Sequence, residues 1–282
     1  MNIPEENTNL PKSGKITSIL VSLLLFLAVI GVAAAVYLKS QGIELKNVSV
    51  AELFSKGAAV NEKTPADRPM TEIGFDTKSH PVFCTYKDLI IKCTGNGGIK
   101  GLNKKGEEVW SLSVTAEKPL LRTNGYELLV ADLEGKSIYV ISGKEVKWSE
   151  KTGGNVLNAE IGKSGHVAVV QEAKGYRNAV KVFDPSGMEM FLRNIAENYV
   201  INARISPSGE QLIINSIDAS GVEANPSLEF FDMMGNPFAA KIPGTGMVFP
   251  IAAYLDDDSL VAASNSLLIY YDSDRDEKWR KE

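Results

Sequence analysis

The fold is decided by one stretch, Ala179-Val-Lys-Val-Phe-Asp-Pro-Ser-Gly-Met-Glu-Met-Phe191. An apolar run ends in Asp184, a tight turn closes on Gly187, and a second strand carries an aromatic at Phe191. An aspartate at the first turn position accepts hydrogen bonds from the turn's own backbone, and a glycine at the fourth position tolerates left-handed geometry. The stretch therefore predicts a β-hairpin.

The same layout recurs along the chain after about residue 80. Further copies are Ile99 to Trp110, Leu228 to Phe238, Leu268 to Trp279 with Arg275 in the glycine place, and Ile138 to Trp148 with a shortened turn at Ser142-Gly143. Aligned on their aromatic, the copies are 38, 43, 47 and 41 residues apart. A period near 40 with four short strands per unit is typical of a β-propeller blade.

We therefore predict an all-β domain over residues 73–282, a propeller of about five four-stranded blades. In blade three we expect strands at Val156 to Ile161, His166 to Gln171, Ala179 to Phe183 and Met188 to Leu192. Because a single blade cannot bury both of its faces, each is stabilised by its neighbours. Five units reach Glu282, and Ile73-Gly-Phe-Asp76 is the candidate for a closing strand. A small closed ring and a truncated form of a larger propeller remain alternatives.

The N-terminal region predicts a membrane anchor. Residues 1–15 are polar and read as a flexible tail, and Ile16 to Leu38 is a run of 23 residues without a charge. As a helix this run is roughly 34 Å long, enough to cross a hydrocarbon core of about 30 Å. The run is longer than the apolar region of a signal peptide, although Ala33 to Ala35 keeps a cleaved signal as the rival interpretation. We expect a single-pass helix in the lipid bilayer, with the tail in the cytoplasm and the propeller outside it.

Residues 39–72 read as a stalk or linker, in which a capping pattern at Ser49 to Glu52 predicts a short helix near Val50 to Lys56. From Asn47 onward the chain has 26 basic and 32 acidic residues and no long basic tract. Binding to a phosphate backbone needs clustered cations, so no nucleic-acid partner is expected.

The two cysteines, Cys84 and Cys93, flank a predicted turn at Lys87-Asp88. With a two-residue turn, Cys84 faces Ile91 and Cys93 faces Val82, from which we expect the two thiols to point to opposite faces of the hairpin. A disulfide and a pair of buried small apolar residues both stay open at this point.

The succession of apolar run, Asp, turn Gly and aromatic over about 200 residues resembles the repeat of pyrroloquinoline-quinone-type and WD40-like propellers. With its N-terminal anchor, the chain also looks like an uncharacterised family of single-pass bacterial membrane proteins. The quinone enzymes that the repeat resembles use an adjacent cysteine pair, which this sequence lacks. The resemblance therefore implies the fold and no cofactor.

No residue set in the sequence identifies a reaction, a catalytic group or a metal site. Asp272-Ser-Asp-Arg-Asp276 has the alternating carboxylates of a calcium loop, but Glu277 stands where such a loop needs glycine, so a hairpin turn is favoured. Long loops on a rigid scaffold are where binding residues usually lie. The candidate binding residues are therefore those of the two longest loops: Tyr176, Arg177, Asp218, Glu223 and Asn225.

These observations predict a membrane-anchored, extracytoplasmic scaffold in the cell envelope that binds a protein or a surface ligand. The alternative is an enzyme that acts on cell-surface glycans through loop carboxylates. A convergent pair of carboxylates with raised pKa in a pocket would favour the enzyme, and a broad unperturbed face would favour the scaffold.

Overall fold

A computed structural model describes residues 72–95, 97–244 and 246–282 of the chain. All of the described residues lie in one compact unit, Met70–Glu282. The predicted tail, membrane helix and stalk helix lie outside the described residues. Within those residues, no helix has the length and the apolar character that a bilayer-spanning segment needs.

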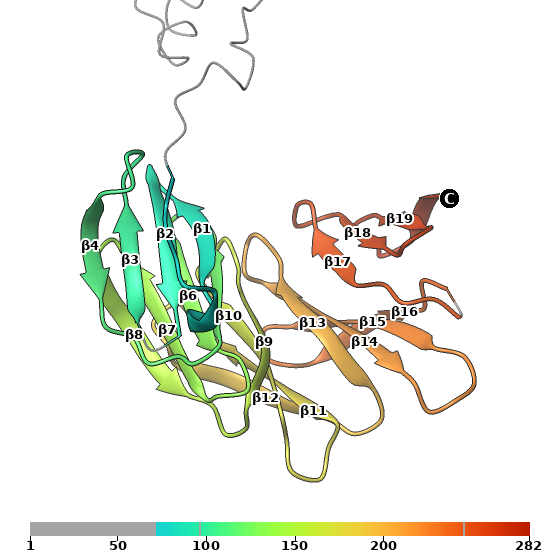
Figure 1. The fold of residues 1–282 in the computed structure, drawn as a ribbon. Coiled ribbons are helices and arrows are strands. Elements are labelled where there is room, and N and C mark those ends of the chain that lie inside the picture. Colours follow the sequence, from blue (N-terminus) through green and yellow to red (C-terminus); the bar gives the residue numbers. More distant parts are fainter. Residues whose placement is uncertain (1–71, 96, 245) are drawn as a thin grey trace, which may run out of the picture. The chain divides into compact units, whose positions relative to one another are not determined.

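This unit consists of four-stranded antiparallel sheets, each built from consecutive strands and called a blade below (Figure 1). Blade 1 contains β1 (Val82–Tyr86), β2 (Leu89–Thr94), β3 (Gly98–Leu102) and β4 (Glu108–Leu112). Blade 2 contains β5 (Pro119–Thr123), β6 (Glu127–Asp132), β7 (Ser137–Ser142) and β8 (Glu145–Lys151). Blade 3 contains β9 (Val156–Ile161), β10 (Val167–Gln171), β11 (Asn178–Phe183) and β12 (Glu189–Ile195). Blade 4 contains β13 (Tyr199–Ile205), β14 (Gln211–Asp218), β15 (Asn225–Asp232) and β16 (Pro237–Lys241), and blade 5 contains β17 (Ile251–Tyr254), β18 (Leu260–Ala263), β19 (Leu268–Tyr271) and β20 (Glu277–Lys281).

The repeated hairpin turn forms as its sequence predicts. The Asp184 carboxylate accepts hydrogen bonds from the backbone N–H groups of Ser186 and Met188, at 2.8 and 2.9 Å. Asp232 and Asp272 bind the backbone of their own turns in the same way. Gly187 has a φ of 93°, where a side chain would be strained, and Arg275 occupies the equivalent position with a φ of 63°. The acidic stretch that begins at Asp272 is thus a hairpin turn, as predicted.

Each blade packs on the next through apolar side chains. Four clusters of buried residues join blade 1 to 2, blade 2 to 3, blade 3 to 4 and blade 4 to 5. Examples are Ile91 with Val130, Val140 with Val167, Val182 with Leu212, and Phe230 with Leu260. Each fully buried side chain of this size contributes about 1.5–3 kcal/mol relative to exposure. The blades therefore depend on one another for stability.

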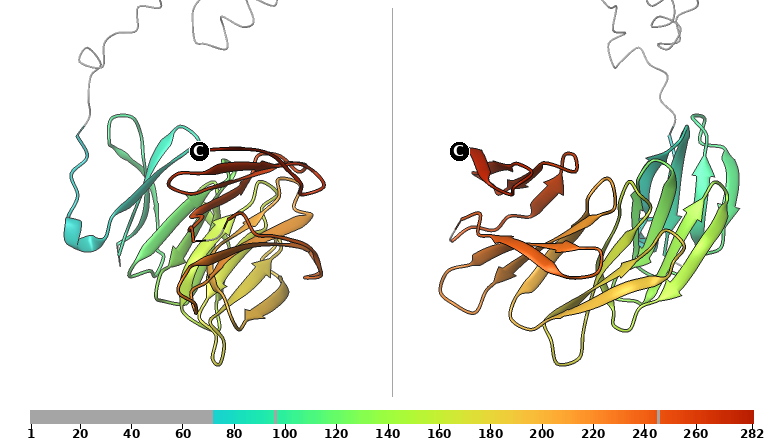
Figure 2. Two further views of the ribbon diagram at one scale, coloured as in Figure 1. Left: turned by 90° about the vertical axis from the view of Figure 1, so that its right-hand side faces the viewer. Right: turned by 180° about the vertical axis from the view of Figure 1, so that it is seen from behind.

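The blades of this unit follow an arc, and blades 1 and 5 stand apart at its two ends (Figure 2). The first strands β1, β5, β9, β13 and β17 contact one another in series along the inner side. The expected closing strand at 73–76 is wrong, because these residues form no strand. Instead Phe75 packs edge-on against Phe83 of β1, with ring centroids 5.5 Å apart, and Lys92 Nζ donates to the Gly74 carbonyl at 3.1 Å. The segment is held against blade 1.

The cysteine hairpin has the predicted register, with Cys84 opposite Ile91 and Cys93 opposite Val82. The expected placement of the thiols on opposite faces is wrong. Residues directly opposite each other point to the same face, as do residues two apart in one strand, so Cys84, Ile91 and Cys93 share a face. Both cysteines are free thiols that pack in the cluster between blades 1 and 2. Burial raises the pKa of Cys84 to about 11 and that of Cys93 to about 12.

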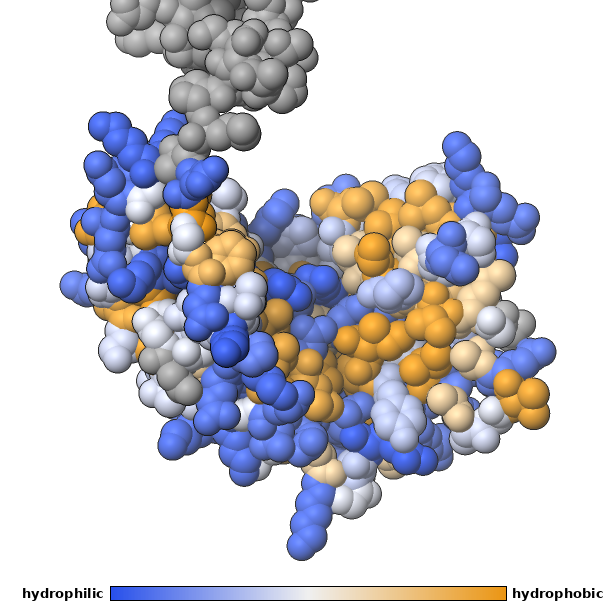
Figure 3. Space-filling model, in the orientation of Figure 1, coloured by the Kyte–Doolittle hydropathy of each residue, from blue (hydrophilic) through white to orange (hydrophobic). Residues whose placement is uncertain are grey.

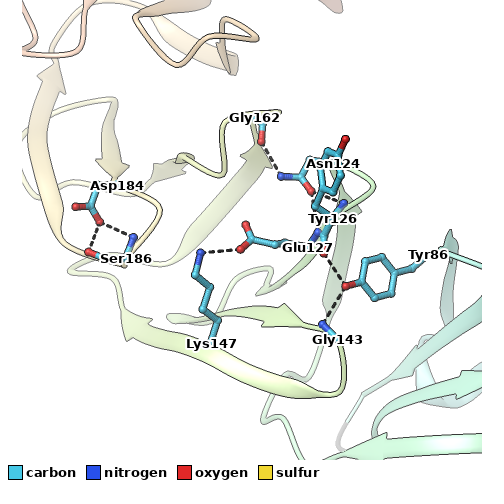
Figure 4. A network of polar contacts seen from close by, with 9 residues as sticks. All are labelled: Tyr86, Asn124, Tyr126, Glu127, Gly143, Lys147, Gly162, Asp184 and Ser186. Atoms are coloured by element: carbon cyan, nitrogen blue, oxygen red, sulfur yellow. Dashed lines mark hydrogen bonds and ion pairs between the residues drawn. The ribbon is translucent and has the colours of Figure 1, made fainter.

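Polar contacts add to the blade interfaces at the end that carries the aspartate turns (Figure 4). The Tyr86 hydroxyl donates to the Tyr126 carbonyl at 2.6 Å and accepts from the Gly143 N–H at 3.0 Å, which links blade 1 to blade 2. Asn124 Nδ2 donates to the Gly162 carbonyl at 2.9 Å and so links blade 2 to blade 3. These bonds satisfy turn backbone groups and fix how neighbouring blades sit.

Candidate functional site

An open groove of about 700 Å³ lies at the end of blades 2 and 3 opposite the aspartate turns. We call this end the loop end, because the longer connections between second and third strands lie there. The groove is bordered by residues 153–155 between the two blades, by residues 171–177 of the β10–β11 loop, and by Lys136, Leu192 and Asn194. The blade packing described above positions all of these segments.

A glycine between blades 2 and 3, Gly154, allows the backbone to approach the β10–β11 loop. A Cβ atom on Gly154 would lie 1.9 Å from the Glu172 carbonyl oxygen, so only glycine fits at this position. The Glu172 N–H donates to the Asn155 carbonyl at 2.9 Å, and the Thr152 hydroxyl donates to the Gly154 carbonyl at 2.7 Å. The groove therefore has a backbone floor held by hydrogen bonds.

Gln171 is the buried polar side chain of this groove. It stands at the end of β10 and is 4% exposed. Its side-chain oxygen Oε1 has no hydrogen-bond partner. Leaving a buried polar group unpaired costs about 1–3 kcal/mol. A buried acceptor without a partner thus lies beside the groove.

The charged side chains around the groove are mainly cations. Lys136, Lys174 and Arg177 are exposed along it, against one carboxylate, Glu172. Arg177 is held in place, because its Nη1 donates to the Tyr199 hydroxyl at 2.8 Å and its guanidinium lies over the Tyr199 ring, 4.9 Å from the centroid. The local field favours an anionic ligand.

Of the predicted binding residues, Tyr176 and Arg177 line the groove. Asp218, Glu223 and Asn225 belong to the neighbouring loop of blade 4 and do not line it. Asp218 and Asn225 are opposite each other at the end of β14 and β15, and Asn225 Nδ2 donates to the Glu223 carbonyl at 3.5 Å. A hydrogen bond from Ser220 and, to a smaller extent, the charge of Arg177 lower the pKa of Asp218. Arg177 therefore connects the two loops electrostatically.

Sequence reasoning missed Gln171, Lys136 and Asn194. They stand within or beside strands rather than in the long loops, so loop length does not single them out. The adjacent Gly153-Gly154 pair was the available signal, since paired glycines mark a close backbone approach.

The carboxyl groups with a shifted pKa in the described part of the chain are all shifted downward. Those at the aspartate turns are Asp184, Asp232, Asp256 and Asp272. For Asp184 the main cause is a hydrogen bond from Ser186, followed by bonds from the turn backbone. These are structural acceptors of the turns, and they lack the raised pKa of a general acid.

The family model described as "Family of unknown function (DUF5711)" matches residues 70–282. This chain belongs to the DUF5711 family. The matched residues include all of the blades. No curated protein matches the sequence.

Solved structures similar to this member of DUF5711 include several propellers. KlHsv2 with loop 6CD replaced by a Gly-Ser linker is 16% identical with a TM-score of 0.53, over 76% of this chain and 74% of that chain. The Dos1 propeller is 14% identical with a TM-score of 0.53, over 71% of this chain and 57% of that one. The Myceliophteria thermophila Cps50 (Swd1) β-propeller domain is 11% identical with a TM-score of 0.52, over 70% and 66%.

This chain thus spans less than two thirds of the last two structures. At these identities the likeness establishes the fold alone. The expected all-β, WD40-like propeller architecture is confirmed.

Proposed function

We propose that this protein is a membrane-anchored binding scaffold whose groove at the loop end of blades 2 and 3 takes an acidic segment of a partner protein. The observation that carries the proposal is the unpaired Gln171 amide oxygen beneath a groove bordered by Lys136, Lys174 and Arg177. A small rotation of the terminal amide torsion, which is soft, turns this oxygen toward the groove. A backbone N–H of an extended segment then satisfies it, while the cations pair with acidic side chains.

The open form of the groove supports a protein segment over a small metabolite. Small-molecule sites are mostly enclosed and lined by apolar side chains. This groove is open and borders on exposed lysine and arginine side chains. The carboxylates with shifted pKa are shifted downward, so a glycan-hydrolysing pair finds no support at the turns.

Binding is tested with the full chain in lipid nanodiscs and a fluorescein-labelled peptide rich in glutamate. We expect Arg177→Glu with Lys174→Glu to weaken binding at least about tenfold, or ~1.4 kcal/mol. Gln171→Leu changes no charge and should also weaken binding, while stability is kept or raised because a buried unpaired group is removed. Lys144→Glu, an exposed lysine on the turn between β7 and β8, is the matched control and should leave binding unchanged. Equal loss in the control would show diffuse charge attraction and overturn the assignment of the groove.

The proposed anchor is Ile16 to Leu38, with the propeller outside the cytoplasm, as in the single-pass bacterial family that the sequence resembles. The length of that uncharged run supports the anchor, and the short tail before a large domain supports the orientation. Protease treatment of intact cells should digest residues 70–282 and leave a membrane-embedded N-terminal fragment. Protection of these residues in intact cells, with digestion after lysis, would reverse the orientation.

A further inference from the structure

Blades 1 to 4 each cover one face with the following blade. We call the face toward the following blade the trailing face and the opposite one the leading face. The four buried clusters fill the interfaces between consecutive blades. In the described residues, no such cluster covers the trailing face of blade 5 or the leading face of blade 1.

One contact recurs at two of the interfaces between blades, those of blade 2 with blade 3 and of blade 3 with blade 4. There the aromatic residue of the fourth strand packs against the turn glycine between the third and fourth strands of the following blade. A Cβ atom on Gly187 would lie 2.8 Å from the Trp148 ring, and one on Gly235 would lie 3.3 Å from the Phe191 ring. Because of this packing Trp148 is 9% exposed.

Trp279 holds the same position in blade 5 and is 45% exposed. Its ring stacks on Tyr270 of the same blade, with centroids 5.6 Å apart and planes 3° from parallel. The strand register aligns two rows of side chains on this face: Ala253, Val261, Tyr270 and Trp279, and Ile251, Ala263, Leu268 and Lys281. In the space-filling view, apolar side chains gather over blade 5 (Figure 3). The trailing face of blade 5 is thus apolar except for Lys281 at its edge.

The leading face of blade 1 is different. Lys92 and Lys100 lie opposite each other in its two central strands, and Lys100 forms an ion pair with Glu108 at 2.7 Å. The segment with Phe75 also packs on this face, against Phe83. A polar outer face of this kind is what a terminal repeat needs for solubility. Blade 1 has the features of a capping unit, and blade 5 has those of an internal one.

We propose that the trailing face of blade 5 binds a further four-stranded antiparallel unit of the same repeat, next in the order of the arc. The leading face of this further unit is apolar, and the glycine of its last turn packs on Trp279. The further unit covers the trailing face of blade 5 in the same way as each following blade covers the trailing faces of blades 1 to 4. A second copy of this chain fits poorly, since its exposed leading face would bring Lys92 and Lys100 toward Lys281.

The test appends a second copy of residues 152–195 after Glu282 in the full chain, held in lipid nanodiscs. This segment is blade 3 with its preceding connection, and its leading face already accommodates Trp148. It contains no tryptophan, so the emission still comes from Trp110, Trp148 and Trp279, the first two of which are 8% and 9% exposed. Acrylamide should quench the unmodified chain through Trp279, and the added unit should abolish most of that quenching.

The matched control is the same fusion with lysine in place of the glycine of the added copy that corresponds to Gly187. It should leave Trp279 as quenchable as in the unmodified chain. Unchanged quenching in both fusions would overturn the proposal. Two results with the unmodified chain would also overturn the proposal. Protection of Trp279 that depends on protein concentration would assign the trailing face of blade 5 to a second copy of the chain. Quenching of Trp279 by brominated lipid would assign this face to the bilayer.

Discussion

The Glu160 carboxylate on β9 forms an ion pair with the Arg204 guanidinium on β13 at 2.6 Å, which joins the innermost strands of blades 3 and 4. The other carboxylate oxygen pairs with Arg122 on β5 at 3.2 Å. One carboxylate therefore holds the first strands of three consecutive blades. The Glu160 side chain is 10% exposed, so solvent screens these pairs less than it screens surface pairs.

We expect Glu160→Gln to lower the free energy of unfolding by about 2 kcal/mol, between the values for exposed and for fully buried pairs. The physical reason is that two arginines are left side by side without a counter-charge. Urea unfolding followed by circular dichroism measures the change. Glu134→Gln, which removes an exposed partner of Lys118, is the control and should change the free energy by less than about 0.5 kcal/mol. Equal changes in the two variants would show that the Glu160 ion pairs contribute no more to stability than an exposed pair does.

Gly187→Ala should destabilise the protein more than Gly125→Ala. Both glycines have a φ near 90°, so both substitutions carry the same backbone strain of about 1–3 kcal/mol. Only at Gly187 does the added Cβ also meet a ring, that of Trp148, at 2.8 Å, whereas nothing lies within 4 Å at Gly125. Thermal unfolding of the two variants measures the difference. Identical losses would mean that the aromatic-on-glycine contact does not constrain the blade interface.

The turn aspartates predict a loss of stability in acid. Hydrogen bonds lower the folded-state pKa of Asp184, Asp232 and Asp272, so their contribution is complete above the unfolded-state pKa of about 3.9 and is lost as the pH falls below it. Replacing all three with Asn keeps an acceptor in each turn and removes the titration. The melting temperature of this variant should fall less between pH 5 and pH 3 than that of the wild type. A parallel fall would place the acid sensitivity elsewhere.

His166 predicts a second step at milder pH. Burial lowers its pKa below the ordinary value, so protonation favours the unfolded chain, and its contribution is lost as the pH falls below about 6.5. Its Nδ1 lies 2.9 Å from the Ser164 hydroxyl. We expect His166→Gln to flatten the dependence of the unfolding free energy on pH between 7 and 5. A variant with the wild-type slope in this range would contradict the assignment.

The two thiols should be unreactive in the folded protein. With pKa values raised to about 11 and about 12 by burial, Cys84 and Cys93 hold almost no thiolate at pH 8, and the thiolate is the reactive form. Iodoacetamide at pH 8 should label them only after urea is added, as mass spectrometry would show. Rapid labelling of the native protein would indicate that the interface between blades 1 and 2 opens readily.

The sequence by itself determined the repeated unit. Asp184 and Gly187 act through their own turn, and the alternation around Phe191 acts through one strand, so these local signals predict the strands without knowledge of the rest of the chain. It also pointed to Arg177, because a long loop on a rigid sheet is visible as an insertion.

Only the tertiary structure decided which residues of different strands and blades are neighbours. The groove brings Lys136, Gln171 and Asn194 together from different strands, and no local pattern records that contact. In the same way, Trp148 is 9% exposed and Trp279 is 45% exposed although both residues occupy the same place in the repeat, because blade 3 packs on Trp148 and no described blade packs on Trp279. Burial depends on the packing of blade against blade, and a single repeat cannot specify its own neighbour.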